Sequence, residues 1–279
     1  MIVTKNMHIG IKAEPTSTSI DIAVLARSAE DLGFESLWTP EHPVLPVKTS
    51  IDVPRAYGEY LDPFVALSRA SAVTTTLKLG TGICLIPERN PLILAKEVAS
   101  IDMVSKGRFI LGVGVGSIRE ETEIMGGDFD HRWTQAREAA EAMKILWREE
   151  EAEFYGNYYN FPPVFCFPKP VQKPHPPIVL GSKSSNVFSR IIQWGDGWIP
   201  NNVTPQDIRH GRKQLDDLAR ASGRDPASLL ITVFEPAADP DLVARFAAAG
   251  ADRVVLPLTS ASSKEVLSEM EQIASWACT

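Results

Sequence analysis

The chain has 279 residues, of which 44% are hydrophobic, and its formal net charge is −7 at pH 7. This length and composition fit one α/β barrel as well as two smaller domains, whereas the negative charge gives no support to nucleic-acid binding. No apolar run approaches the ~20 residues of a membrane helix and no signal-peptide pattern is present, so we expect a soluble, cytoplasmic protein with no membrane partner. The three cysteines (Cys84, Cys166 and Cys278) lie far apart and form no C-x-x-C motif, and this pattern is typical of a protein in a reducing compartment.

Short apolar runs alternate along the chain with segments of helical periodicity. The predicted strands are His8–Ala13, Ser36–Thr39, Leu79–Leu85, Phe109–Val115, Pro177–Leu180, Gly197–Pro200, Leu229–Phe234 and Arg253–Pro257. The predicted helices are Ser19–Leu32 with Ser19 as N-cap, Asp62–Thr76, Pro91–Ser105, Arg132–Arg148, Ser185–Trp194, Pro205–Ala221, Pro240–Ala249 and Ser263–Trp276. Eight evenly spaced units favour a closed (β/α)8 TIM barrel over a doubly wound sheet, in a single domain over residues 1–279.

Two long insertions interrupt this alternation. Glu41–Leu61 follows the second strand and is therefore a βα loop, which we expect to cover the mouth of the barrel where active sites lie. Glu149–Pro176 follows the fourth long helix and starts at the opposite end. We favour a small hairpin that plugs the barrel bottom over a ligand cage built from its aromatic residues, which include Tyr155, Tyr158, Tyr159 and Phe161.

Glycines recur at alternate positions near the ends of two strands. They are Gly80 and Gly82 in the third strand and Gly112, Gly114 and Gly116 in the fourth. Alternate residues share a face, so these glycines predict a cleared surface for a flat ligand, with close helix packing as the alternative. The run is not a dinucleotide fingerprint, because Ser117 stands where G-x-G-x-x-G requires glycine.

Titratable residues follow the second and fourth strands. Glu41 and His42 end the second strand, where barrel enzymes place acid–base groups; a loop-capping histidine is the alternative. The Arg119–Glu121 run either carries a functional carboxylate or, as we favour, forms a solvated helical turn. Cys84 has no base beside it and is predicted to be an apolar filler rather than a nucleophile. The other histidines lack ligand spacing, so no metal site is predicted.

The loop Gly181–Ser185 joins the fifth strand to a helix and consists of small residues around Lys183. Backbone N–H groups, the helix dipole and the hydroxyls at such a place can hold a phosphate. Simple N-capping by Ser184 or Ser185 is the alternative.

These motifs together resemble the luciferase-like monooxygenase superfamily and, within it, the oxidoreductases that depend on the deazaflavin coenzyme F420. The resemblance runs nearly end to end. It is carried by LWTPEH, by LDPFVALSRASAVTTTLKLGTGICLIPERNPLILAKEVASIDMVSKGRFILGVGVGSIREE, and by YGNYYNF, PKPVQKPHPPIVLGS and GDGWIP.

The resemblance implies a role for several residues. It makes His42, with Glu41, the cofactor-facing catalytic position, and it implies a non-proline cis peptide at Gly82–Ile83 beneath the ring of the cofactor. Members specific for sugar phosphates have a glutamate where this chain has Ser117, so a sugar-phosphate substrate is not expected, and Glu120 or Glu121 replaces that acid only if the loop folds back. The implied cofactor-binding residues are Gly82, Ile83, Cys84, Gly114, Gly116 and Ser117 for the ring, and Gly181, Ser182, Lys183 and Ser184 for the phosphate.

The leading hypothesis is therefore transfer of a hydride between F420 and a small organic substrate, with His42 moving a proton. A monooxygenase that uses reduced flavin (FMN) is the first alternative, and a non-catalytic flavin- or deazaflavin-binding protein is the second. The resemblance also implies a homodimer, which exposed apolar helices after the second and third strands would suit.

Overall fold

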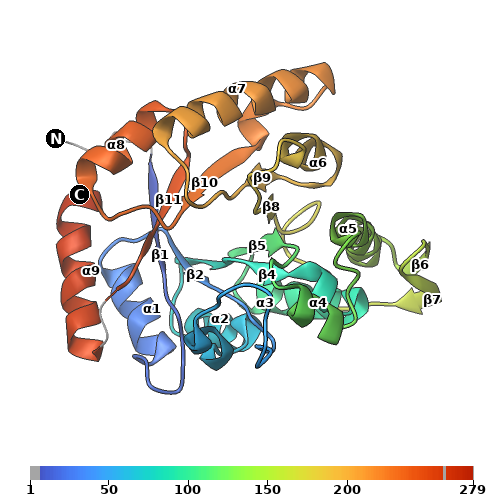
Figure 1. Cartoon of the computed structure of the whole chain (residues 1–279), viewed down its shortest axis with the longest axis horizontal. Coiled ribbons are helices and arrows are strands. Elements are labelled where there is room, and N and C mark those ends of the chain that lie inside the picture. Colours follow the sequence, from blue (N-terminus) through green and yellow to red (C-terminus); the bar gives the residue numbers. More distant parts are fainter. Residues whose placement is uncertain (1–6, 260–261, 279) are drawn as a thin grey trace.

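A computed structural model describes residues 7–259 and 262–278. Parallel strands form a closed barrel that helices surround (Figure 1), in the order β3-β2-β1-β11-β10-β9-β8-β5-β4, and β3 also pairs with β5. The barrel strands are β1 (His8–Lys12), β2 (Ser36–Thr39), β3 (Lys78–Thr81), β4 (Cys84–Leu85), β5 (Phe109–Gly114), β8 (Ile178–Leu180), β9 (Gly197–Trp198), β10 (Leu230–Phe234) and β11 (Arg253–Pro257). This topology confirms the predicted (β/α)8 barrel.

Helices pack around the outside of the strands. They are α1 (Ile22–Asp31), α2 (Pro63–Ser71), α3 (Pro91–Val104), α4 (Arg119–Ile124), α5 (Arg132–Arg148), α6 (Val187–Trp194), α7 (Pro205–Ala221), α8 (Pro240–Ala248) and α9 (Ser263–Ala277), with 3₁₀ turns η1 (Arg55–Glu59), η2 (Ile86–Glu88) and η3 (Pro226–Ser228). No helix in the described part of the chain is both long enough and apolar enough to cross a bilayer.

Side-chain carboxylates set the start of α1 and the end of α2, and both differ from the predicted boundaries. Helix α1 begins after Asp21, whose carboxylate accepts from the N–H of Ala23, and not at Ser19. Helix α2 ends at Ser71 because the carboxylate of Glu30 in α1 accepts hydrogen bonds from the backbone N–H groups of residues 75–77 at 2.6–2.9 Å. Those residues are therefore held outside the helix.

The predicted third strand is split into β3 and β4. The peptide bond between Gly82 and Ile83 lies at the split and is cis, as the resemblance implied.

The barrel interior is filled by the protein's own side chains. An apolar cluster of Trp38, Ile110, Val179, Ile199, Phe234 and Val255 occupies it, with Ile83 packed against it. A Cβ added at Gly80 would lie 2.3 Å from Trp38, and one added at Gly82 would lie 2.3 Å from the ring of Phe234. The prediction that these two glycines leave an open face was therefore wrong, because they make room for aromatic side chains of other strands.

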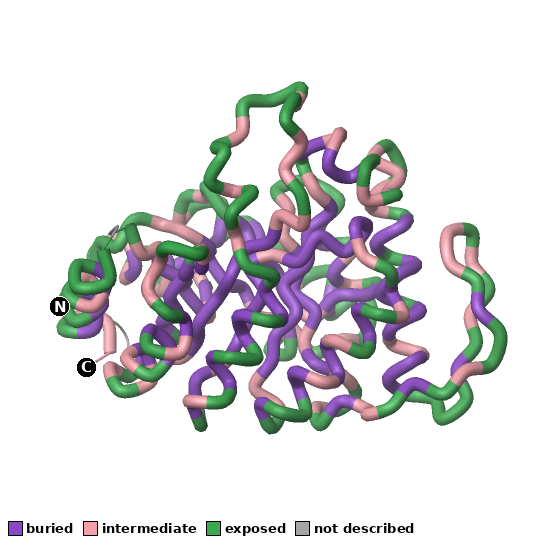
Figure 2. The backbone as a smooth tube through the Cα atoms, turned by 90° about the horizontal axis from the view of Figure 1, so that it is seen from below, coloured by how far each residue is buried: buried purple, intermediate pink, exposed green. Residues whose placement is uncertain are grey.

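The insertion after α5 forms the predicted hairpin, β6 (Glu151–Tyr155) and β7 (Asn160–Phe165), but it does not plug the barrel. It projects outward beyond α5, clear of the buried core (Figures 1 and 2). The segment after it covers the barrel bottom instead, since the N–H groups of Val171 and Gln172 donate to the buried carboxylate of Asp102 at 2.7 and 3.0 Å. The aromatic residues of this insertion do not form a ligand cage either, because the side chain of Phe161 is buried whereas that of Tyr155 is exposed.

Candidate functional site

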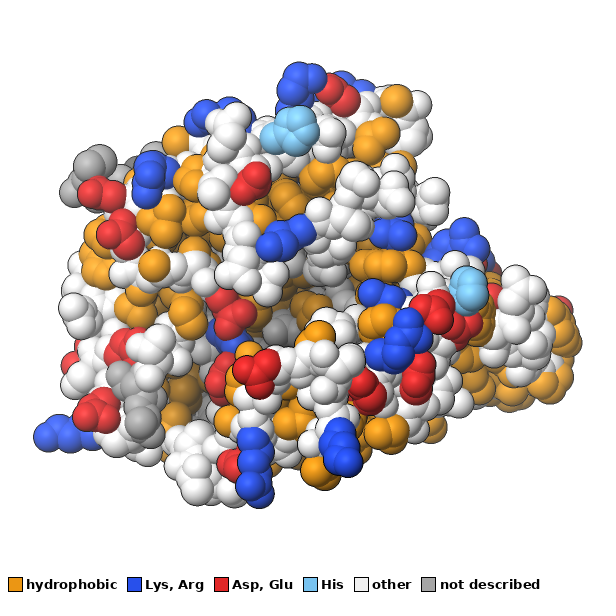
Figure 3. Space-filling model, in the orientation of Figure 1, with side chains coloured by type: hydrophobic (Ala, Val, Ile, Leu, Met, Phe, Trp, Pro, Cys, Tyr) orange, Lys and Arg blue, Asp and Glu red, His pale blue; other side chains and the backbone are white. Residues whose placement is uncertain are grey.

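The candidate site residues lie in the loops at the C-terminal ends of the strands. The face drawn in Figure 3 is hollowed near its centre, and acidic and basic side chains stand beside hydrophobic ones at the edge of the hollow. His42 follows β2, Ile83 precedes β4, and the glycine-rich end of β5 lies next to both β4 and β8. Parallel barrels place their catalytic groups at this end.

His42 is paired with a carboxylate that the sequence analysis did not favour. Its Nδ1 atom lies 2.9 Å from an oxygen of Glu121 in α4, and the side chain of Glu121 is buried. The imidazole also stacks on Tyr57 of the covering loop, with ring centroids 5.1 Å apart. Carboxylate oxygens accept hydrogen bonds, so this pairing favours the tautomer with the proton on Nδ1 and leaves Nε2 as the atom that can exchange a proton with a ligand.

Helix α4 is the feature that brings Glu121 to the mouth. The chain turns at Gly116, which has φ of +76°, and α4 then folds back over the barrel end. Glu120 points elsewhere and accepts from the N–H of Ser50 at 2.8 Å. The acidic run after the strand glycines was the available signal, but the sequence did not show which of its two glutamates turns inward.

Glu41 has a different environment from the one predicted for a catalytic acid. Its carboxylate is buried, pairs with Arg89, and accepts from the N–H of Leu85 at 2.7 Å. Arg89 in turn reaches Asp62 and Glu97. This arrangement ties β4 to the end of β2, so we assign Glu41 a positioning role.

Glu88 in η2 is a second buried carboxyl group, within electrostatic range of Glu121. One of its oxygens accepts from the hydroxyl of Thr122 at 2.8 Å, and the other has no partner within the described chain. Burial, together with the charges of Glu121 and Glu41, raises the pKa of Glu88 to about 8. Glu88 therefore carries a proton at neutral pH.

Replacing Glu88 with glutamine is expected to change how stability depends on pH. Between pH 4.5 and about 8 the unfolded chain releases this proton and the folded chain keeps it, so the free energy of unfolding of the wild type falls as the pH rises. Glutamine mimics the protonated acid, so the stability of Glu88→Gln relative to wild type should rise by on the order of 3 kcal/mol between pH 5 and pH 8. Urea unfolding at both pH values measures this. The control is Glu153→Gln, at an exposed glutamate. If the two variants change the pH dependence of stability equally, the raised pKa of Glu88 is contradicted.

Lys12 lies at the end of β1 in a charged cluster. Its ammonium pairs with Glu14 at 2.5 Å and with Glu235 at the end of β10. Burial acts to lower the pKa of Lys12, but the hydrogen bonds to the two carboxylates outweigh it and raise the pKa. Lys12 therefore stays charged and is not an amine nucleophile.

The predicted ring-binding residues lie around Ile83. Its side chain is half-buried and fills the space above Gly114, where an added Cβ would lie 2.0 Å from Cδ1 of Ile83. Gly114 therefore supports Ile83 and does not clear a cavity. Ser117 is exposed beside it. Cys84 is fully buried and burial raises the pKa of its thiol, which fits the predicted apolar filler and leaves only its backbone for contact with a ligand.

The predicted phosphate loop follows β8. The hydroxyl of Ser182 accepts from the N–H of Ser184 at 3.0 Å, and Arg190 donates to the hydroxyl of Ser184 at 3.1 Å. Helix α6 begins at Val187 with no side-chain cap, so the alternative of serine N-capping is not observed. The loop, including Lys183, borders a cavity of about 490 Å³.

Comparison with known proteins shows the family. The model of the luciferase-like monooxygenases matches residues 7–253. The chain belongs to the luciferase-like monooxygenase family. It is 35% identical to the Uncharacterized protein Rv0953c of Mycobacterium tuberculosis over 96% of this chain and 98% of that protein.

Two solved structures share the fold of this luciferase-like protein. The monooxygenase RslO1 from Streptomyces bottropensis superposes with a TM-score of 0.82 at 23% identity, over 97% of this chain and 98% of that one. The coenzyme F420-dependent tetrahydromethanopterin reductase from Methanopyrus kandleri superposes with a TM-score of 0.78 at 19% identity, over 97% of this chain and 98% of that one. Luciferase-like proteins are oxidoreductases, and these neighbours include both F420-dependent and oxygenase types.

The residues of this luciferase-like mouth fit a flavin or deazaflavin. The half-buried Ile83 offers an apolar surface for a ring, and an added Cβ at Gly181 would lie 3.2 Å from its Cδ1, so this surface continues to the loop after β8. Ser182, Lys183 and Arg190 supply hydroxyls and positive charge for a phosphate. The hydroxyl of Thr39, at the end of β2, is buried without a partner among the described residues.

Proposed function

We propose that this protein transfers a hydride between coenzyme F420 and a small organic substrate at the mouth of the barrel. The observation that carries the proposal is the His42–Glu121 pair at the end of β2. The N–H of Gly82, which precedes Ile83, donates to the carbonyl oxygen of Thr39 at 2.8 Å, so this proton-exchanging group and the surface that suits a redox ring lie on neighbouring strand ends. Similarity in fold to an F420-dependent reductase supports the choice of cofactor.

Each residue has a defined part in the proposed reaction. F420 supplies or accepts the hydride when it is bound. His42 gives or takes the proton at Nε2, while Glu121 holds the imidazole in one tautomer and one orientation. Tyr57 and the covering loop exclude water from that side.

Titration of the purified protein with F420 and with FMN, followed by calorimetry or fluorescence, tests the cofactor. We expect F420 to bind at least tenfold more tightly than FMN. Arg190→Gln is expected to weaken F420 binding about tenfold, because a charge-assisted contact to the phosphate is lost. Tight binding of FMN together with no affinity for F420 would rule the proposal out.

A monooxygenase that uses reduced FMN is the second candidate, favoured by the similarity to RslO1. The two candidates differ in their use of oxygen. Oxygen consumption that depends on reduced FMN and on an organic substrate would support the monooxygenase, and its absence would support hydride transfer.

We also infer that the protein is a homodimer. The outer faces of α2 and α3 expose apolar side chains, with exposed fractions of 67% for Val65, 60% for Ile93 and 53% for Val104. Light scattering at micromolar concentration is expected to give twice the mass of the chain, and Ile93→Lys is expected to give a monomer. A wild-type protein that runs as a monomer would refute this inference.

A further inference from the structure

A cavity of about 270 Å³ opens at the bottom of the barrel, at the end opposite to His42. It is lined by the first residues of four strands, Lys78, Phe109, Leu230 and Arg253, and by the segment of residues 172–177. We propose that this cavity is a second binding site, which takes a small monocarboxylate with an apolar body. The proposal is independent of the chemistry at the mouth.

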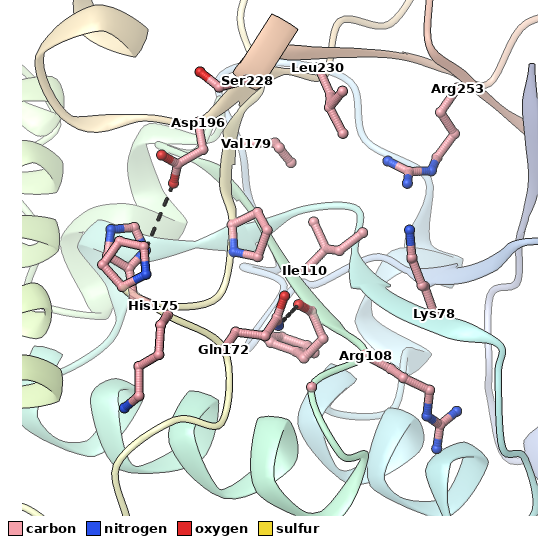
Figure 4. A pocket seen from close by; sticks show the side chains of 15 residues that line it. Lys78, Arg108, Ile110, Gln172, His175, Val179, Asp196, Ser228, Leu230 and Arg253 are labelled. Atoms are coloured by element: carbon pink, nitrogen blue, oxygen red, sulfur yellow. Dashed lines mark hydrogen bonds and ion pairs between the residues drawn. The ribbon is translucent and has the colours of Figure 1, made fainter. Parts of the chain in front are cut away.

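One side of the cavity carries a positive charge that the protein does not neutralise. In Figure 4, Lys78 and Arg253 point toward one another across this side. They share one carboxylate, that of Glu35, at 2.9 and 2.7 Å. Burial acts to raise the pKa of Glu35, but the hydrogen bonds and charge of Arg253 hold it at about 2. Two cations against one anion leave a net charge of about +1.

Arg253 is built to receive an anion. Its side chain is 1% exposed, and it donates through Nε and Nη2 to Glu35 and through Nη1 to Thr232. These bonds use three of the five N–H groups of a guanidinium, so two are left for a ligand. The positive character is local, because the whole chain has a net charge of −7.

The middle of the cavity is apolar, and Asp196 and His175 lie on its far side. Figure 4 shows Ile110, Val179 and Leu230 between the two cations and Asp196. The carboxylate of Asp196 accepts from the N–H of Ile178 at 3.0 Å and is paired with Arg224 at 3.5 Å, so this side offers no excess positive charge to an anion. A ligand with one carboxylate therefore places its head at Lys78 and Arg253 and its hydrocarbon part over the apolar residues.

The walls of the cavity are fixed in place without a ligand. The side-chain amide of Gln172 donates to Asp102 at 2.6 Å and to the carbonyl oxygen of Phe109 at 2.8 Å. This holds the segment before β8 against the start of β5. Preformed walls reduce the ordering that binding requires. The volume lies just below the ~300–1,000 Å³ of pockets for drug-sized molecules, so a smaller ligand is expected.

Calorimetric titration with octanoate tests the site. Octanoate is expected to bind the wild type, and Lys78→Gln is expected to weaken binding at least about tenfold, because one charge-assisted contact is lost. The neutral isostere octanamide should bind wild type at least about tenfold more weakly than octanoate. The matched control is Lys213→Gln, which removes an exposed lysine paired with Asp217 and should leave octanoate binding unchanged.

Competition distinguishes this site from the mouth. Saturating F420 or FMN should not displace octanoate, and Leu230→Trp, which fills the cavity, should abolish octanoate binding while the thermal transition persists. The proposal is overturned by any of three results: no binding of octanoate to the wild type, equal binding of octanamide, or displacement of octanoate by F420 or FMN.

Discussion

Replacing His42 with alanine is expected to lower kcat at least about a hundredfold, with any substrate that the wild type turns over, and to change the Kd for the cofactor by less than threefold. The reason is that His42 is placed to exchange a proton through Nε2, whereas the apolar surface at Ile83 and the loop after β8 are untouched. Steady-state kinetics and cofactor titration of the variant measure both quantities.

The control for this prediction is His131→Ala. His131 is a surface histidine with a similar acidic partner, Asp128, and its side chain is 68% exposed. The His131→Ala variant should keep wild-type activity. Glu121→Gln should lower kcat through His42 alone, so the double variant His42→Ala/Glu121→Gln should be no slower than His42→Ala. If the fold losses of kcat in the two single variants multiply in the double variant, Glu121 acts independently of His42.

Gly112→Ala is expected to destabilise the protein by about 3 kcal/mol or more. An added Cβ would lie 2.0 Å from the carbonyl oxygen of Thr81 in the neighbouring strand. That oxygen cannot retreat, because the hydroxyl of Thr81 donates to the carbonyl of Gly112 at 2.7 Å and β3 is paired with β5. Chemical denaturation measures the loss.

Gly114→Ala is the matched comparison, because its added Cβ meets only the end of a side chain, Cδ1 of Ile83, also at 2.0 Å. Ile83→Ala in the same chain should therefore recover most of the stability lost by Gly114→Ala. It should recover none of the loss caused by Gly112→Ala. Loss of less than 1 kcal/mol in Gly112→Ala would show that the strands have more freedom to separate than the structure indicates.

The barrel could be predicted from the sequence because each strand and helix carries its own local pattern. The bounds of β2, β11, α5 and α7 match the predicted ones for this reason, since apolar periodicity and caps such as the Thr204 capping box lie within the element. The end of α2 could not be predicted, because it depends on the carboxylate of Glu30 in another helix.

The location of the candidate site could be predicted from the sequence, but most contacts within the site could not. His42 and the loop after β8 follow strands, so their place at the mouth follows from the topology. The partner of His42 does not, because Glu121 reaches it only after α4 folds back. Likewise, the glycines of β3 indicated a close approach, but only the three-dimensional arrangement shows that Trp38 and Phe234 take up the space.

A structure determined with F420 bound would show whether the barrel mouth holds the cofactor in the proposed way. We expect the ring to lie on Ile83, with its reactive edge within hydrogen-bonding reach of His42 through the substrate or a water molecule. We expect the phosphate to contact Ser182 and Ser184. A ring bound away from Ile83, or a phosphate held outside the loop after β8, would contradict the proposal.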